Sequence, residues 1–101
     1  MGSITNPGTN VTTFSGEYKL LALNDLSVST ASDAITLSYA NNGISEITSI
    51  QGSISDGLST TFSFLQTSFS GLAITVKSFE QDGTAATGWG SATVNLLVVG
   101  K

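Results

Sequence analysis

The sequence predicts an all-β protein that folds as a compact antiparallel β-sandwich of six to seven strands. Apolar and polar residues alternate in several segments, most clearly at 33–40 and 58–66, and Gly, Asn and Asp stand between these segments. Alternation with a period of two is typical of strands that bury one face, and short, regular spacing of such strands is typical of sandwiches. Ser and Thr, thirty of the 101 residues, suit the solvent-facing positions and the turns of this fold.

The residue types that the chain lacks exclude several kinds of chemistry. There is no Cys and no His, so the sequence offers no disulfide, no thiol, no His-activated nucleophile and none of the usual zinc ligands. We therefore expect a protein that is not an enzyme and that has neither a cofactor nor a transition-metal centre. Only oxygen ligands for Ca²⁺ or Mg²⁺ remain.

The charge pattern argues against nucleic acid as a partner. Only ten residues are charged, none of them is Arg, and the net charge is −4. Nucleic-acid binding requires clustered Lys and Arg that displace counterions. No uninterrupted apolar run approaches the ~20 residues of a membrane helix, and the N-terminus lacks the basic and apolar regions of a signal peptide. We expect binding neither to nucleic acid nor to a membrane.

Residues 1–16 are interpreted as an extended N-terminal arm, and residues 17–101 as a single β-sandwich domain. The arm combines Gly, Pro, Asn and Thr with the isolated apolar residues Ile4, Val11 and Phe14. Two interpretations of it remain open. It is either a frayed tail, since termini are often loose, or an arm whose apolar residues dock on a neighbouring subunit.

The first half of the domain predicts a strand and then a hairpin. Residues 17–23 predict a strand, with a short helix as the alternative for so brief an apolar run, and Asn24-Asp25 suggests a turn. Asn41-Asn42-Gly43 predicts a hairpin turn because Asn and Gly tolerate positive φ. The second strand of that hairpin, at 44–50, also has the Ile spacing of a helix, but its β-branched residues favour a strand.

The second half predicts a strand at 58–66, a connection at 67–71, and a closing hairpin formed by 72–79 and 92–99. The closing strand is apolar on both faces towards its end.

Both residues 20–23 and residues 96–99 are apolar on the two faces of a strand. A strand of this kind is covered on both sides, and in so small a chain we expect another subunit to provide one of the covers. This reasoning places a subunit interface at Leu21, Leu23, Leu97 and Val99.

The loop at 80–91 is the best candidate for a ligand or partner site. It holds Glu80 and Asp82, whose carboxylates suit hydroxyls or Ca²⁺, and Trp89, the only Trp of the chain. Three interpretations of Trp89 remain open: a cap on one end of the sandwich, an anchor in a subunit or partner interface, or a platform on which a sugar stacks.

Residues 71–79, followed by Asp82 and residues 94–100, resemble the closing hairpin of the H-type lectin fold. The shared features are a glycine-led alternating strand that ends on an aromatic residue and an acid, and a final strand that runs through aliphatic residues to glycine. The resemblance implies a six-stranded antiparallel sandwich that forms tight trimers and binds N-acetylgalactosamine-type sugars between subunits. The chain departs from the family at Phe79 and Leu96, where the family has Trp, and in lacking the sugar-contacting Arg.

Composition and fold together also resemble the small structural proteins of tailed phages. We therefore expect a homotrimeric virion protein that decorates a capsid as a cement protein. Its partner would be the major capsid protein or another virion surface, and the arm at 1–16 would anchor it there. It would be located in the virion, after assembly in the host cytoplasm. The alternative is a carbohydrate-binding, H-type-lectin-like module, either from a phage fibre or a free lectin, with a glycan as its ligand.

Overall fold

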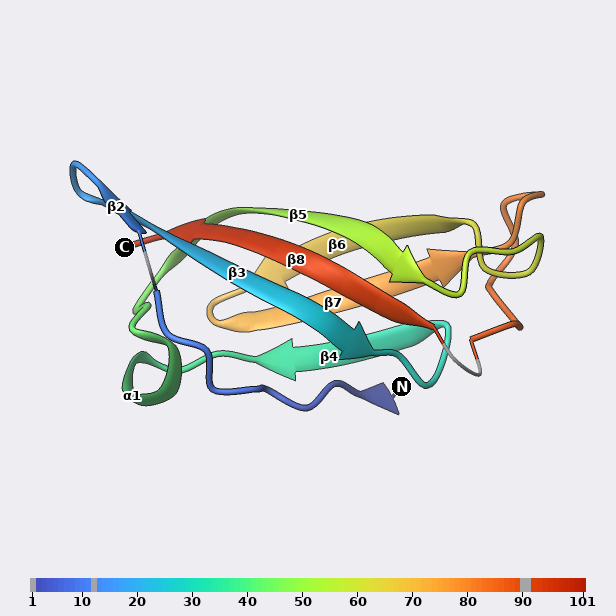
Figure 1. Cartoon of the computed structure of the whole chain (residues 1–101), viewed down its shortest axis with the longest axis horizontal. Helices are drawn as coiled ribbons and strands as arrows, with labels where there is room; N and C mark the ends of the chain where they lie inside the picture. The colour runs from blue at the N-terminus through green and yellow to red at the C-terminus, as the bar shows by residue number, and fades with distance from the viewer. Residues whose placement is uncertain (1, 12, 90–91) are drawn as a thin grey trace.

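The computed structural model describes residues 2–11, 13–89 and 92–101, with only the backbone described at 13–15. Two sheets pack face to face in it (Figure 1), and the predicted β-sandwich is thereby confirmed. One sheet has the order β1-β4-β7-β6, formed by Gly2–Ser3, Ser32–Thr36, Ala73–Phe79 and Phe64–Ser70. The other has the order β2-β3-β8-β5, formed by Thr13–Ser15, Tyr18–Ser27, Thr93–Gly100 and Ile47–Asp56.

The core lies between the two sheets and is built from alternate residues of their central strands. In β8 the side chains of Val94, Leu96 and Val98 are buried, and in β7 those of Ile74 and Val76. The period of two in the sequence therefore marks the inner face directly, because successive strand residues point to opposite sides. The other large buried side chains include Leu21, Leu23, Ile35, Leu37, Ile44 and Phe62.

The predicted hairpin at Asn41-Asn42-Gly43 is wrong. Residues Tyr39–Asn42 form a single helical turn, α1, which begins after the N-cap Ser38 and ends at Gly43 with φ of 77°. The strands on either side, β4 and β5, lie in different sheets. A left-handed glycine ends a helix as readily as it closes a hairpin, so this signal does not distinguish the two structures.

In the two segments for which a helix was the alternative, the predicted strand is confirmed. Residues 18–27 form β3, which continues through the expected turn at Asn24-Asp25 by means of a β-bulge, and Asp25 adopts a left-handed φ of 55° there. Residues 47–56 form β5, which pairs along its length with β8.

The predicted strand at 58–66 is displaced along the chain. Residues 58–63 form a loop closed by a bridge between Ser59 and Phe62, and β6 begins at Phe64 and extends through the segment predicted as a connection. The turn falls at Gly71, where φ is 60°. Between Phe64 and Gly71 no Gly or Pro interrupts the strand, which explains why it continues.

The predicted closing hairpin is also wrong, because its two strands belong to different sheets. β7 pairs with β4 and β6, whereas β8 pairs with β3 and β5. The loop between β7 and β8 therefore crosses from one sheet to the other at one end of the sandwich (Figure 1). The hairpin on which the H-type lectin resemblance was based is thus a crossover between the sheets.

The N-terminal segment at 2–11 packs on its own chain. Gly2 and Ser3 pair in parallel with β4, and the backbone N–H of Ile4 donates to the carbonyl of Ala34 at 2.8 Å. The side chain of Ile4 is buried in the core and that of Val11 packs against it. Within the described residues this segment thus adds a short strand to one sheet and a side chain to the core of its own chain.

Asp33, at the start of β4, is a buried carboxylate that organises the connection from β3. It accepts hydrogen bonds from the backbone N–H of Ser29 at 2.7 Å and of Thr30 at 3.3 Å, and from the Thr30 hydroxyl at 2.7 Å. These donors replace the water that the carboxylate loses on burial.

We predict that Asp33→Ala lowers the free energy of unfolding by about 2–3 kcal/mol, because it leaves partly buried donors without an acceptor. Urea denaturation measures the change. The control is Glu46→Ala, at an exposed position, which should change the free energy by no more than about 0.5 kcal/mol. Equal effects of the two substitutions would contradict the role of Asp33.

Candidate functional site

The loop at 80–91 is held by hydrogen bonds to its own backbone and to the neighbouring loop. The N–H of Glu80 donates to the carbonyl of Thr84 at 2.7 Å, and the N–H of Gly83 donates to the carbonyl of Glu80 at 3.0 Å. Further along, the N–H groups of Thr87 and Gly88 both donate to the carbonyl of Thr61, at 3.1 and 3.2 Å. The described part of this loop is therefore a built structure with its backbone groups largely satisfied.

Asp82 closes the turn within this loop. Its carboxylate accepts hydrogen bonds from the backbone N–H of Thr84 at 3.0 Å and from the Thr84 hydroxyl at 2.7 Å. These bonds stabilise the ionised form and lower the pKa of Asp82 below its usual value, although the side chain is exposed. The position predicted as a ligand residue thus already has a local structural task.

Glu80 has a separate partner. Its carboxylate accepts a hydrogen bond from the Thr87 hydroxyl at 2.8 Å, which ties the start of the loop to a residue further along it. No hydrogen bond in the described part of the chain joins any two of the predicted site residues Glu80, Asp82 and Trp89. Among the described residues there is also no cluster of three or more acidic side chains that could hold a metal ion.

Trp89 is half-buried and packs against the hydrophobic core. Its carbonyl accepts a hydrogen bond from the N–H of Ala92 at 3.1 Å, so its backbone helps to lead the chain into β8. Of the three interpretations of this residue, the geometry supports the cap on the end of the sandwich. Residues 90 and 91, which also belong to the predicted loop, lie outside the described residues.

The four residues predicted as a subunit interface divide into two pairs. Leu21 and Leu23 are 0% exposed and lie in the core, so the assignment of these two to an interface is corrected. Leu97 is 42% exposed and Val99 is half-buried, and both point to the outer side of β8. The pairs separate because residues two apart share one face of a strand, and Leu21 and Leu23 share the inner one.

The outer side of β3 and β8 carries a continuous apolar strip, which we call the β3–β8 face: Leu20, Ala22, Leu97 and Val99. Leu20 lies opposite Val99 in the sheet, and Ala22 lies opposite Leu97. Sequence reasoning recognised the apolar character of both strands but selected inner residues of β3. The β-bulge between Leu23 and Leu26 shifts the alternation of β3 by one residue, so that Leu21, Leu23 and Leu26 all face the core. A strict period of two does not reproduce this pattern, and the inner side of β3 was therefore not recognised in the sequence.

A hollow of about 340 Å³ adjoins this face. Its apolar lining comes from Ala22, Leu96 and Leu97. The amides of Asn24, Gln51 and Asn95 also line it, and Oδ1 of Asn95 accepts a hydrogen bond from the N–H of Asp25 at 2.9 Å. Amide side chains both donate and accept hydrogen bonds, so the hollow can bind hydroxyl or peptide groups next to an apolar surface.

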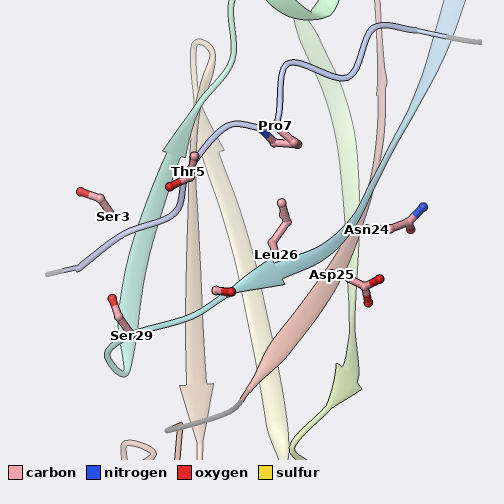
Figure 2. A pocket seen from close by; sticks show the side chains of 8 residues that line it. Ser3, Thr5, Pro7, Asn24, Asp25, Leu26 and Ser29 are labelled. Atoms are coloured by element: carbon pink, nitrogen blue, oxygen red, sulfur yellow. The ribbon is translucent and has the colours of Figure 1, made fainter.

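A second groove, of about 320 Å³, separates the N-terminal segment from the end of β3. Figure 2 shows Leu26 projecting into this space, whereas Asn24 and Asp25 project away from the N-terminal segment. The carboxylate of Asp25 accepts a hydrogen bond from Ser55 on β5 at 3.0 Å. Ser3 and Thr5 on the opposite wall supply hydroxyls, so the groove offers hydrogen-bonding groups on both sides.

Two further apolar side chains are exposed where β5 and β6 lie against each other. Leu58 is 70% exposed and Phe64 is 53% exposed, although the alternation at 58–66 predicted both on the buried face with Phe62. Only Phe62 is buried, because the loop at 58–63 breaks the strand geometry on which that phase depends.

Comparison with family models, with curated proteins and with solved structures finds no match to this chain. Within the described residues, no helix is long and apolar enough to cross a membrane. The assignment of a function therefore depends on the surface and the composition alone.

We predict that Trp89→Ala lowers the free energy of unfolding by about 2 kcal/mol, because truncation of a half-buried ring exposes core surface and leaves a void. Thermal or urea denaturation measures the loss. Leu58→Ala serves as the control, since a side chain that is 70% exposed should contribute no more than about 0.5 kcal/mol. An unchanged stability of Trp89→Ala would remove the cap interpretation.

We also predict that the stabilisation from Asp82 depends on pH. Because the pKa of Asp82 is lowered in the folded state, its carboxylate stabilises the fold fully at pH values above the usual aspartate pKa of about 3.9. This stabilisation is lost as the pH falls through the folded-state pKa of Asp82. Asp82→Asn should therefore be less stable than the wild type at neutral pH, and the difference should shrink in acid. Urea denaturation midpoints of Asp82→Asn and the wild type, measured at neutral and at acidic pH, test this prediction. Glu46→Gln is the control, and a difference between Asp82→Asn and the wild type that does not change with pH would contradict the prediction.

Proposed function

We propose that the protein is a non-enzymatic structural component of a virion, a homotrimeric capsid decoration (cement) protein. Its binding partner in this proposal is the major capsid protein or another virion surface, and its location is the virion. The observation that carries the proposal is the β3–β8 face, where the central strand β8 exposes Leu97 beside Val99, Leu20 and Ala22. A central strand with apolar residues on its outer side is suited to contact with a further protein layer.

The side-chain chemistry supports a structural role. The sequence contains no His, Cys or Arg, and the two carboxylates of the candidate loop are engaged with Thr84 and Thr87. The surface is instead rich in Ser, Thr and amide groups with few charges. Such a surface binds through shape, apolar contact and hydrogen bonds more than through charge.

The N-terminal segment contributes to the fold of its own chain. Residues 2–11 lie along β4 and contribute Ile4 to the core of their own chain. In the proposal, contact with the capsid or with other subunits is therefore assigned to the β3–β8 face rather than to an extended arm.

The second candidate function is carbohydrate binding, and the hollow beside Leu97 favours it. Asn24, Gln51 and Asn95 present amides that can bond sugar hydroxyls next to an apolar floor. This site differs from the loop at 80–91 that the sequence suggested. A glycan screen separates the two functions, since only the second requires binding that Asn95→Ala removes.

We predict that light scattering of the purified protein at micromolar concentration gives three times the 10.3 kDa chain mass. Leu97→Lys should reduce this mass to that of a monomer, because it places a charge in the proposed contact without disturbing the core. Leu58→Lys is the matched control, since it changes another exposed leucine, and it should leave the trimer intact. A monomeric wild-type protein would contradict the proposed assembly.

A further inference from the structure

Asn42, at the end of α1, holds the N-terminal segment by its side-chain amide. Its Oδ1 accepts from the amide of Asn6 at 2.8 Å, and its Nδ2 donates to Oδ1 of Asn6 at 3.1 Å and to the carbonyl of Thr9 at 2.8 Å. We call this arrangement the Asn6–Asn42 clasp. The N–H of Ser38 completes it by donating to Oδ1 of Asn42 at 3.1 Å.

Asn42 also precedes Gly43, and this is the only Asn-Gly step in the sequence. In such a step the backbone nitrogen of the glycine can attack the asparagine side-chain carbonyl, because glycine has no Cβ to obstruct the approach. Asparagine is for this reason among the thermolabile residues of proteins.

The folded structure blocks this attack in two ways. The N–H of Gly43 donates to the carbonyl of Tyr39 at 2.9 Å, so the nucleophile is engaged in the cap of α1. The side chain of Asn42 is 0% exposed and its amide is held on both sides by the clasp. The reaction therefore requires local opening of α1 and of the N-terminal segment.

We propose that Asn42 is a conditional deamidation site, protected while residues 2–11 are docked and α1 is closed, and reactive once both have opened. The Gly43 nitrogen forms a bond to Cγ of Asn42 and loses its proton, and the side-chain nitrogen departs as ammonia. Water then opens the resulting succinimide, which yields either aspartate or isoaspartate at position 42. Water is the only co-reactant, and no electron is transferred.

The product cannot rebuild the clasp. A carboxylate oxygen then faces Oδ1 of Asn6 and the carbonyl of Thr9, so two donated hydrogen bonds become contacts between acceptors at a buried charge. Isoaspartate in addition places an extra methylene in the backbone at the end of α1. Deamidation thus converts reversible undocking of residues 2–11 into a permanent release that exposes Ile4 and Val11. This inference does not depend on the proposed function.

The first experiment measures deamidation by intact mass and by peptide mapping for isoaspartate after incubation at mildly alkaline pH. The wild type in buffer should react at Asn42 at least about tenfold more slowly than the same chain in urea, because only the opened fraction reacts. Asn6→Ala, which opens the clasp and leaves the Asn-Gly step intact, should accelerate the reaction in buffer. Thr5→Ala is the control at an exposed neighbouring position and should not.

Equal rates for the wild type in buffer and in urea would overturn the protection, and equal rates for Asn6→Ala and Thr5→Ala would overturn the role of the clasp.

A second measurement tests the consequence by hydrogen exchange. Asn42→Asp should remove the protection of residues 2–11 while the amides of β8 stay protected and report that the sandwich is folded. The control Asn41→Asp adds the same charge at the exposed neighbouring position. Unchanged protection of 2–11 in Asn42→Asp would overturn the release.

Discussion

The pairing of β8 with both β3 and β5 holds the two halves of the chain in one fold. It joins the last strand of the chain to one of the first, so the sheet exists only when the whole sequence has been brought together. β8 also supplies Val94, Leu96 and Val98 to the centre of the core. Loss of this strand would open one sheet down its middle and expose the core to water.

Buried polar side chains organise the connections around that core. Asp33 gathers the donors of the turn between β3 and β4, and Asn42 ties α1 to the N-terminal segment. These groups help to specify a unique arrangement, because a buried polar group left without partners costs more than an apolar one. The side-chain amide of Asn42 that forms these hydrogen bonds is also the group that the proposed deamidation removes.

Apolar residues that the core does not use are distributed unevenly over the surface. The β3–β8 face carries four of them together, whereas Leu58 and Phe64 lie at the seam near the other sheet. The carboxylates and the Trp of the loop at 80–91, in contrast, are used within the loop and the core. The outer side of β8 is therefore a better candidate for a contact surface than the loop at 80–91.

The fold class and the buried faces of β7 and β8 could be predicted from the sequence, because the alternation of residues 72–79 and 92–99 follows from strand geometry alone. The sequence also excluded His- and Cys-based chemistry by composition. Only the tertiary structure decided which strands pair, since Asn42-Gly43 closes a helical turn as well as a hairpin and the loop at 80–91 can join strands of one sheet or of two. The pairing of the strands depends on contacts between residues that are distant in sequence. The burial of Leu21 and the roles of Asp33 and Asn42 depend on such contacts as well, and a local sequence pattern contains no information about them.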